Sequence, residues 1–217
     1  MRNKVINSIC AMAIGAVVLA PSLGRAQETS ASPQAKLASS AKDIRLEAVN
    51  TRDQLKSAVD ALDALTKQKS GDLKPAYDTF VAEVKKTHNA AETTAARAGS
   101  MDSASKDYFG AWQADVGGIS KESLRKNAQR RLDDVRKSYD TVIASLRQGA
   151  VAFKPFLSDL DDVQKTLAND VTVGGVKSIR DTASDATKAQ RKVLRNINDA
   201  IDQLASMEKA LSTQKAD

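Results

Sequence analysis

Apolar residues recur along the chain in alternating steps of three and four, which is the spacing of one face of an α-helix. The pattern extends from Pro33 onward and is interrupted at 70–72, 117–118 and 169–175, where Gly, Asn, Asp and β-branched residues gather. The four runs between these breaks are longer than usual globular helices, which favours coiled-coil-like packing. We therefore expect four long helices, each with a single apolar stripe.

Each stripe has to be buried against a neighbouring helix, and short connections make consecutive helices antiparallel. The stripe of the third run consists of Leu124, Ala128, Leu132, Val135, Tyr139, Val142, Leu146 and Phe153. Pro155 lies in the same run and is expected to kink or break the helix, leaving a bend and then a shorter helix. The predicted fold is all-α, an elongated antiparallel bundle of long coiled-coil-like helices, one of them kinked at Pro155.

The first residues follow the order of a secretory signal peptide. Arg2 and Lys4 form a basic start, an apolar run occupies 5–20, and the small-residue ending Gly-Arg-Ala occupies 24–26. This order predicts cleavage after the last of these residues and export to the periplasm through the general secretory route. An uncleaved membrane anchor is the alternative, but the apolar run is shorter than the ~20 residues of a spanning helix. We expect no membrane span in the mature chain.

Cleavage would divide the chain into a signal peptide at 1–26, a flexible tail at 27–35 and one elongated helical-bundle domain at 36–214. The peptide contains three cationic residues and no acid, so its removal lowers the formal net charge from +6 to +3. A mature chain with so balanced a charge, in an exported location, is not expected to bind nucleic acid. The single cysteine, Cys10, is also removed, which excludes a disulfide framework, a thiolate metal site and a cysteine nucleophile.

Seven Lys and Arg residues lie between Lys121 and Lys137. At about 100° per residue, Lys126, Arg130 and Lys137 point away from the apolar stripe, and the other basic residues flank it. Acidic residues are interleaved with them at spacings of three and four, which favours a solvated helix face with internal ion pairs. A binding site for an anionic glycan or lipid is the alternative.

Three aromatic residues precede the second break and include the only tryptophan of the chain. Such a group is either an anchor for a binding partner or a hydrophobic plug at one end of the bundle. The candidate partner-binding residues are therefore Tyr108, Phe109, Trp112, Lys126, Arg130 and Lys137.

The remaining chemistry is sparse. His88 is the only histidine and lies mid-helix beside Lys85 and Lys86, so we expect it at the surface or at the core boundary. The Glu-x-x-His pairs of di-iron bundles are missing, and the acids at 159–162 lack the glycine and closing glutamate of a calcium loop. We predict no catalytic residue, no cofactor and no metal site.

Three stretches, at 71–80, 108–147 and 153–179, together cover about a third of the chain. Their most specific features are the tryptophan before the loop, the Ser-Leu-Arg that opens the next helix, and the proline followed by an Asp-bearing helix. In these stretches the chain resembles a bacterial exported helical family known as domain of unknown function 2959. The resemblance implies a helical and often exported protein, and it supplies no activity or catalytic residues.

These patterns favour a non-enzymatic periplasmic helical bundle that acts as an envelope scaffold, spacer or partner-binding module. Two alternatives stay open: binding of peptidoglycan or anionic lipid through the basic helix at 121–137, and a holdase-type periplasmic chaperone. The expected partner is an envelope protein or polymer, and a homo-oligomer is possible.

Overall fold

The structure is a computed structural model that describes residues 31–213, and these residues fall into one compact unit. The predicted signal peptide at 1–26 and the first part of the predicted tail at 27–35 lie outside the described residues. Over the described range the chain is helical and forms no strand, which confirms the predicted all-α class.

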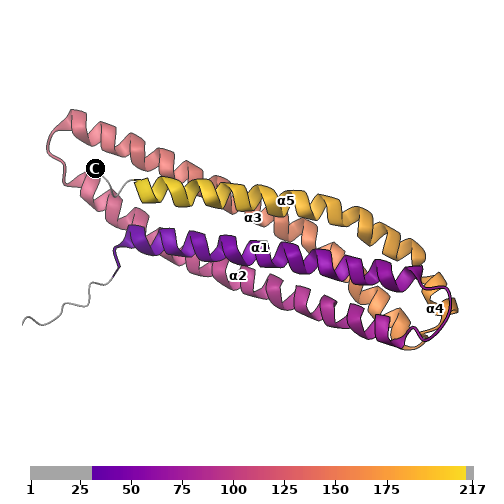
Figure 1. Ribbon diagram of the computed structural model, residues 1–217. Coiled ribbons are helices and arrows are strands. Elements are labelled where there is room, and N and C mark those ends of the chain that lie inside the picture. The colour runs from indigo at the N-terminus through magenta and orange to yellow at the C-terminus, as the bar shows by residue number, and fades with distance from the viewer. Residues whose placement is uncertain (1–30, 214–217) are drawn as a thin grey trace, which may run out of the picture. The chain divides into compact units, whose positions relative to one another are not determined.

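Four long helices and one short helix make up this unit (Figure 1). Their bounds are α1 (Pro33–Lys67), α2 (Lys74–Gly117), α3 (Glu122–Ala168), α4 (Val173–Ser178) and α5 (Arg180–Thr213). The first helix thus begins inside the predicted tail. The three predicted breaks coincide with the connections between helices, except that α4 occupies part of the third.

The long helices form a bundle in which α1 packs against α2 and α5, while α3 packs against α5 and less extensively against α2 (Figure 1). Consecutive long helices are antiparallel. The helices α2 and α3 have 44 and 47 residues, whereas α1 and α5 have 35 and 34. At about 1.5 Å per residue, the α2–α3 hairpin is therefore longer than its neighbours by roughly 13–20 Å, and Figure 1 shows its end extending past them.

Local signals set the start of α1 and the turn that follows it. Ala35 donates its backbone N–H to Ser32 Oγ at 3.2 Å, and Pro33 occupies the first turn, where its missing N–H costs little. The chain then reverses at Gly71, whose φ of +88° lies in the left-handed region that favours glycine. Lys74 opens α2 by donating its backbone N–H to Asp72 Oδ1 at 2.9 Å.

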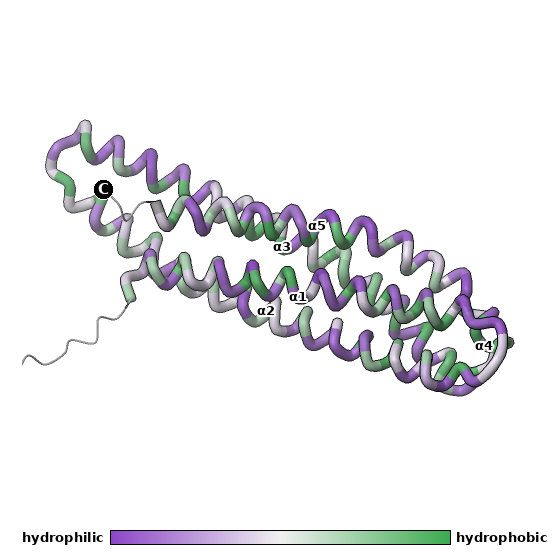
Figure 2. The backbone as a smooth tube through the Cα atoms, viewed as in Figure 1, coloured by the Kyte–Doolittle hydropathy of each residue, from purple (hydrophilic) through white to green (hydrophobic). Residues whose placement is uncertain are grey.

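Hydrophobic and hydrophilic residues alternate in bands along each helix (Figure 2), and the buried residues gather in two separate clusters. The cluster nearer α4, here called the α4 cluster, includes Ala48, Leu55, Phe80, Phe153, Phe156, Leu160, Val176 and Ile197. The cluster nearer the α2–α3 connection, here called the hairpin cluster, includes Leu37, Ile44, Met101, Tyr108, Phe109, Leu132, Tyr139 and Leu204. The core is therefore discontinuous along the bundle.

The predicted stripe of α3 is buried or partly buried from Ala128 onward but exposed at its start. Leu132 is fully buried, whereas Leu124 is 54% exposed. The prediction for Leu124 was wrong because this part of α3 lies in the hairpin end, past the helices that would cover it (Figure 1). Between Phe109 and Leu132, Val116 is the only buried residue.

Pro155 lies inside α3, and the helix continues on both sides of it. The predicted division into a long helix and a separate shorter helix is therefore wrong. Pro155 itself is exposed, while Phe153 and Phe156 on either side of it are buried in the α4 cluster. Burial of these flanking side chains holds the helix together across the position where proline removes a backbone hydrogen bond.

Glycine at the third break serves close packing. Gly175 lies in α4, and a Cβ built there would be 2.0 Å from the backbone oxygen of Asp170. Thr172 caps this short helix by accepting the backbone N–H of Gly175 at 3.2 Å. The segment whose sequence predicts a loop is thus a tight helical turn. Only glycine fits at position 175 of this turn.

We expect Gly175→Ala to lower the free energy of unfolding by about 1–3 kcal/mol, because the added methyl group forces the Asp170 backbone to move. Gly99→Ala is the control, since a Cβ there would meet nothing within 4 Å and alanine is favoured in a helix by about 0.5–1 kcal/mol. Urea denaturation of both variants measures the difference. Equal stability of the two variants would contradict the close contact in α4.

Candidate functional site

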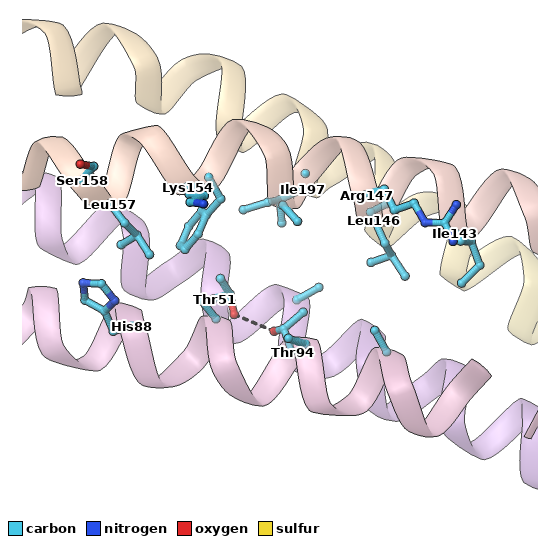
Figure 3. A pocket seen from close by; sticks show the side chains of 18 of the residues that line it. Thr51, His88, Thr94, Ile143, Leu146, Arg147, Lys154, Leu157, Ser158 and Ile197 are labelled. Carbon is cyan, nitrogen blue, oxygen red and sulfur yellow. Dashed lines mark hydrogen bonds between the residues drawn. The ribbon is translucent and has the colours of Figure 1, made fainter. Parts of the chain in front are cut away.

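A groove runs between α2 and α3 where the two core clusters meet, and α1 and α5 contribute to its walls. Its volume is about 690 Å³, and apolar side chains make up most of its lining. Figure 3 shows Ile143, Leu146 and Leu157 pointing from α3 towards α2. Small-molecule sites in proteins occupy about 300–1,000 Å³ and are mostly apolar, so this groove is a candidate binding site.

The groove exists because α2 carries small side chains at mid-length and large ones nearer its ends. At one end the Tyr77 hydroxyl donates to the backbone oxygen of Gln164 at 3.1 Å. At the other end the rings of Phe109 and Tyr139 pack edge to face, with centroids 5.6 Å apart. Between these contacts the groove is lined on α2 by Ala91, Ala95 and Ala98. A methyl group is too short to bridge the two helices.

His88 of α2 and Asp161 of α3 form a pair at one end of the groove. Their Nε2 and Oδ1 atoms are 2.9 Å apart, and the two side chains are 37% and 35% exposed. The predicted boundary position of His88 is therefore confirmed. The acidic partner could not be predicted from the sequence, because 73 residues separate the two and only the packing of α2 against α3 brings them together.

The pair is not completed by a hydroxyl nucleophile among the side chains that line the groove. Ser158 lies one turn from Asp161, but its hydroxyl points away from His88 (Figure 3). The hydroxyl groups of Thr51 and Thr94 form a hydrogen bond with one another, with 2.9 Å between their Oγ1 atoms. A histidine and an acid without a positioned nucleophile lack the arrangement needed for acyl transfer.

Asp102 of α2 lies at the other end of the groove. It accepts a hydrogen bond from Lys106 Nζ at 2.7 Å and another from the Tyr139 hydroxyl at 3.2 Å. The hydrogen bond from Lys106 lowers the pKa of Asp102 below its usual value, and the positive charge of Arg147 adds to this effect. Burial raises the pKa of Tyr139. Asp102 is therefore an ionised carboxylate with hydrogen-bond donors around it, rather than a proton donor.

The aromatic candidates form one contiguous group on α2. The ring centroid of Tyr108 lies 5.2 Å from that of Phe109 and 5.5 Å from that of Trp112. Tyr108 and Phe109 are buried in the hairpin cluster, and Trp112 is partly buried against it. Burial raises the pKa of Tyr108 to about 12, although the charge of Arg131 opposes this rise. Two of the three aromatic candidates are thus part of the core.

The basic candidates are exposed on α3 and form fewer ion pairs than their spacing suggests. Lys126 pairs with Glu122 at 2.8 Å, as expected. Arg130 donates a hydrogen bond to Asn127. Lys137 is exposed, and it has no ion pair within 4.0 Å among the described residues.

The structure brings the basic stretch and the aromatic group together. The guanidinium carbon of Arg136 lies 5.2 Å from the centroid of the Phe109 ring, which is the geometry of a cation–π contact. The groove is a separate feature, and the sequence-based candidates do not line it.

Two further properties hold for the described part of the chain. Residues 31–213 contain no group of three or more His, Cys, Asp or Glu side chains that could hold a metal ion. None of the helices in this range combines the length and apolarity needed to cross a membrane.

Comparison with protein families matches residues 32–211 to the family described as protein of unknown function (DUF2959). The chain belongs to this family. The match covers all the long helices almost completely, so the groove and the hairpin end both lie within the DUF2959 region. Neither the curated proteins nor the solved structures contain a match to the chain.

Proposed function

We propose that this DUF2959 protein is a non-enzymatic helical scaffold of the bacterial periplasm that binds an anionic envelope component through the end of the α2–α3 hairpin. The export signal in the sequence supports the location, and the His–Asp pair without a nucleophile supports a binding role rather than a catalytic one. The anionic component is peptidoglycan or the head groups of an acidic lipid surface.

The exposed hairpin end, residues 110–131, is the observation that carries this proposal. These residues contain five Lys and Arg side chains and two carboxylates. All five cationic side chains are exposed, and only Lys126 has a carboxylate partner within 4.0 Å among the described residues. A protruding, net cationic surface that is largely unpaired favours association with an anionic surface.

Apolar side chains at the same end support contact with a partner. Leu124 is exposed, and Trp112 and Ile119 are half-buried. A binding surface commonly combines an aromatic or aliphatic centre with a charged rim, and tryptophan and arginine are over-represented in such surfaces. The position past the ends of α1 and α5 leaves this surface accessible (Figure 1).

We expect the triple variant Arg125→Glu, Lys126→Glu and Arg130→Glu to lose at least tenfold in affinity for phosphatidylglycerol vesicles or purified peptidoglycan. A basic residue near an anionic membrane contributes about 1 kcal/mol, so three reversals exceed this threshold. All three side chains are exposed, and substitutions at exposed positions usually change stability little, so the fold is retained. Sedimentation with vesicles and with peptidoglycan, at low and high salt, measures the binding.

The matched control reverses Arg191, Lys192 and Arg195, which are exposed on α5 away from the hairpin end. This control should bind as the unchanged protein does, although its net charge changes by the same amount. Equal losses of affinity in both triple variants would show that binding depends on net charge alone. This result would refute the hairpin end as the contact surface. Binding that does not weaken with salt would refute it as well.

A further inference from the structure

The groove leaves apolar surface uncovered in the middle of the bundle. Ile143, Leu146 and Leu157 of α3 are each partly exposed, and each lines the groove. Three of the six groove-lining residues of α2 are alanine, and these short side chains leave part of the apolar surface of α3 open. Apolar surface costs about 25 cal/mol per Å² when it stays in water, and contiguous patches of this kind mark binding sites.

Two acids, Asp102 and Asp161, and two strong cations, Arg147 and Lys154, line the groove. Its two acids are already engaged, Asp161 with His88 at 2.9 Å and Asp102 with Lys106 at 2.7 Å. Its two strong cations, Arg147 and Lys154, form no ion pair within 4.0 Å in the described part of the chain. These two cationic groups are therefore available to an anionic group, although the charge of Arg147 also acts on Asp102.

The dimensions of the groove favour a narrow ligand over a helix. From His88 to Asp102 it extends along 14 residues of α2, which corresponds to roughly 21 Å. A helix about 10 Å wide over that length would occupy roughly 1,600 Å³. The groove volume of about 690 Å³ is less than half of this value. A helix could lie only partly inside the groove, whereas an extended single chain fits within it.

We infer that the groove binds a single-chain anionic amphiphile. The acyl chain lies between α2 and α3 against the apolar side chains, and a carboxylate or phosphate head group is held by Arg147 or Lys154. The ligand would join the two core clusters into one continuous apolar core. A free fatty acid and a lysophospholipid share this chemistry, and both serve as probes.

The test measures binding of palmitate and of 16-carbon lysophosphatidylglycerol to the mature protein by calorimetry, below the concentrations at which either forms micelles. Gly149→Leu should lower the affinity for both at least tenfold. Gly149 is buried in α3 and lines the groove, and a Cβ there would meet nothing within 4 Å, so the first atom of the added side chain has room beside the groove. Gly110→Leu is the matched control, since Gly110 is also helical with open space around it but lies outside the groove.

A second pair of measurements tests the head-group contact. The double variant Arg147→Gln and Lys154→Gln should lose at least tenfold in affinity for palmitate and keep its affinity for hexadecanol, which has the same chain without a charge. Binding of either anionic probe with these losses supports the inference. Failure of both probes to bind, or equal binding by Gly149→Leu and Gly110→Leu, would overturn it. The hairpin triple variant should bind palmitate normally, so failure here is distinguishable from failure of the proposed envelope contact.

Discussion

Phe156→Ala is expected to lower the free energy of unfolding by about 3–5 kcal/mol. The Phe156 side chain is fully buried in the α4 cluster, and its ring centroid lies 6.0 Å from that of Phe153. Truncation removes the buried ring and leaves a cavity that the surrounding helices cannot close completely. The loss is a large fraction of the total stability of an ordinary domain, so the unfolding midpoint in urea should fall clearly.

Val151→Ala is the control on the same helix, because Val151 is 76% exposed. Substitution there should change the free energy of unfolding by no more than about 0.5 kcal/mol. The two positions flank Pro155, so the pair also tests whether the helix keeps one face buried across the proline. A comparable loss at both positions would contradict the orientation of α3 around Pro155.

The helices could be predicted because their apolar spacing depends only on local sequence. Each run was predicted to have one apolar stripe, and the residues at spacings of three and four from Ile44 to Leu65 in α1 and from Ala186 to Leu211 in α5 are mostly buried. A helix with one apolar face has few ways to bury it, and in a bundle of antiparallel neighbours that face becomes the core. The positions of the breaks followed from their glycine, asparagine and aspartate content for the same reason.

Features that depend on how far one helix extends along another could not be predicted. Leu124 has the right spacing for the core, but its exposure depends on where α1 and α5 end relative to the hairpin. Local rules for proline predicted a kink or a break at Pro155, and the helix does not break there because the tertiary burial of its neighbours outweighs one missing hydrogen bond. At Gly175, the space for a Cβ is taken by the backbone oxygen of Asp170, whose close approach the sequence does not reveal.

The candidate site depends even more on alignment between helices. His88 meets Asp161 only because of the register of α2 against α3, and a shift by one turn would move the pair apart by about 5.4 Å. The groove needs small residues on one helix to face apolar residues on another. In the sequence, each of these two sets of residues looks like an ordinary helix surface. The groove can therefore be recognised only from the packing of the helices.

Phe109→Ala should also destabilise the fold, by about 3–5 kcal/mol, although Phe109 belongs to the aromatic group that the sequence offers as a binding anchor. Its ring is buried in the hairpin cluster and contacts the Tyr139 ring and the Arg136 guanidinium of α3. Because α2 packs less extensively against α3 than against α1, this contact is among the main links between the two helices. Urea denaturation, with circular dichroism to follow helix content, measures the loss.

Trp112→Ala separates the two interpretations of the aromatic group. Trp112 is partly exposed at the edge of the hairpin cluster, so its truncation should cost less than half of the loss caused by Phe109→Ala. The same substitution should weaken binding to phosphatidylglycerol vesicles, because Trp112 lies in the hairpin end beside the exposed cations. A plug role for the whole group would instead give similar stability losses at both positions and unchanged binding. The buried rings thus hold the hairpin together, and the half-exposed ring at its end is available to a partner.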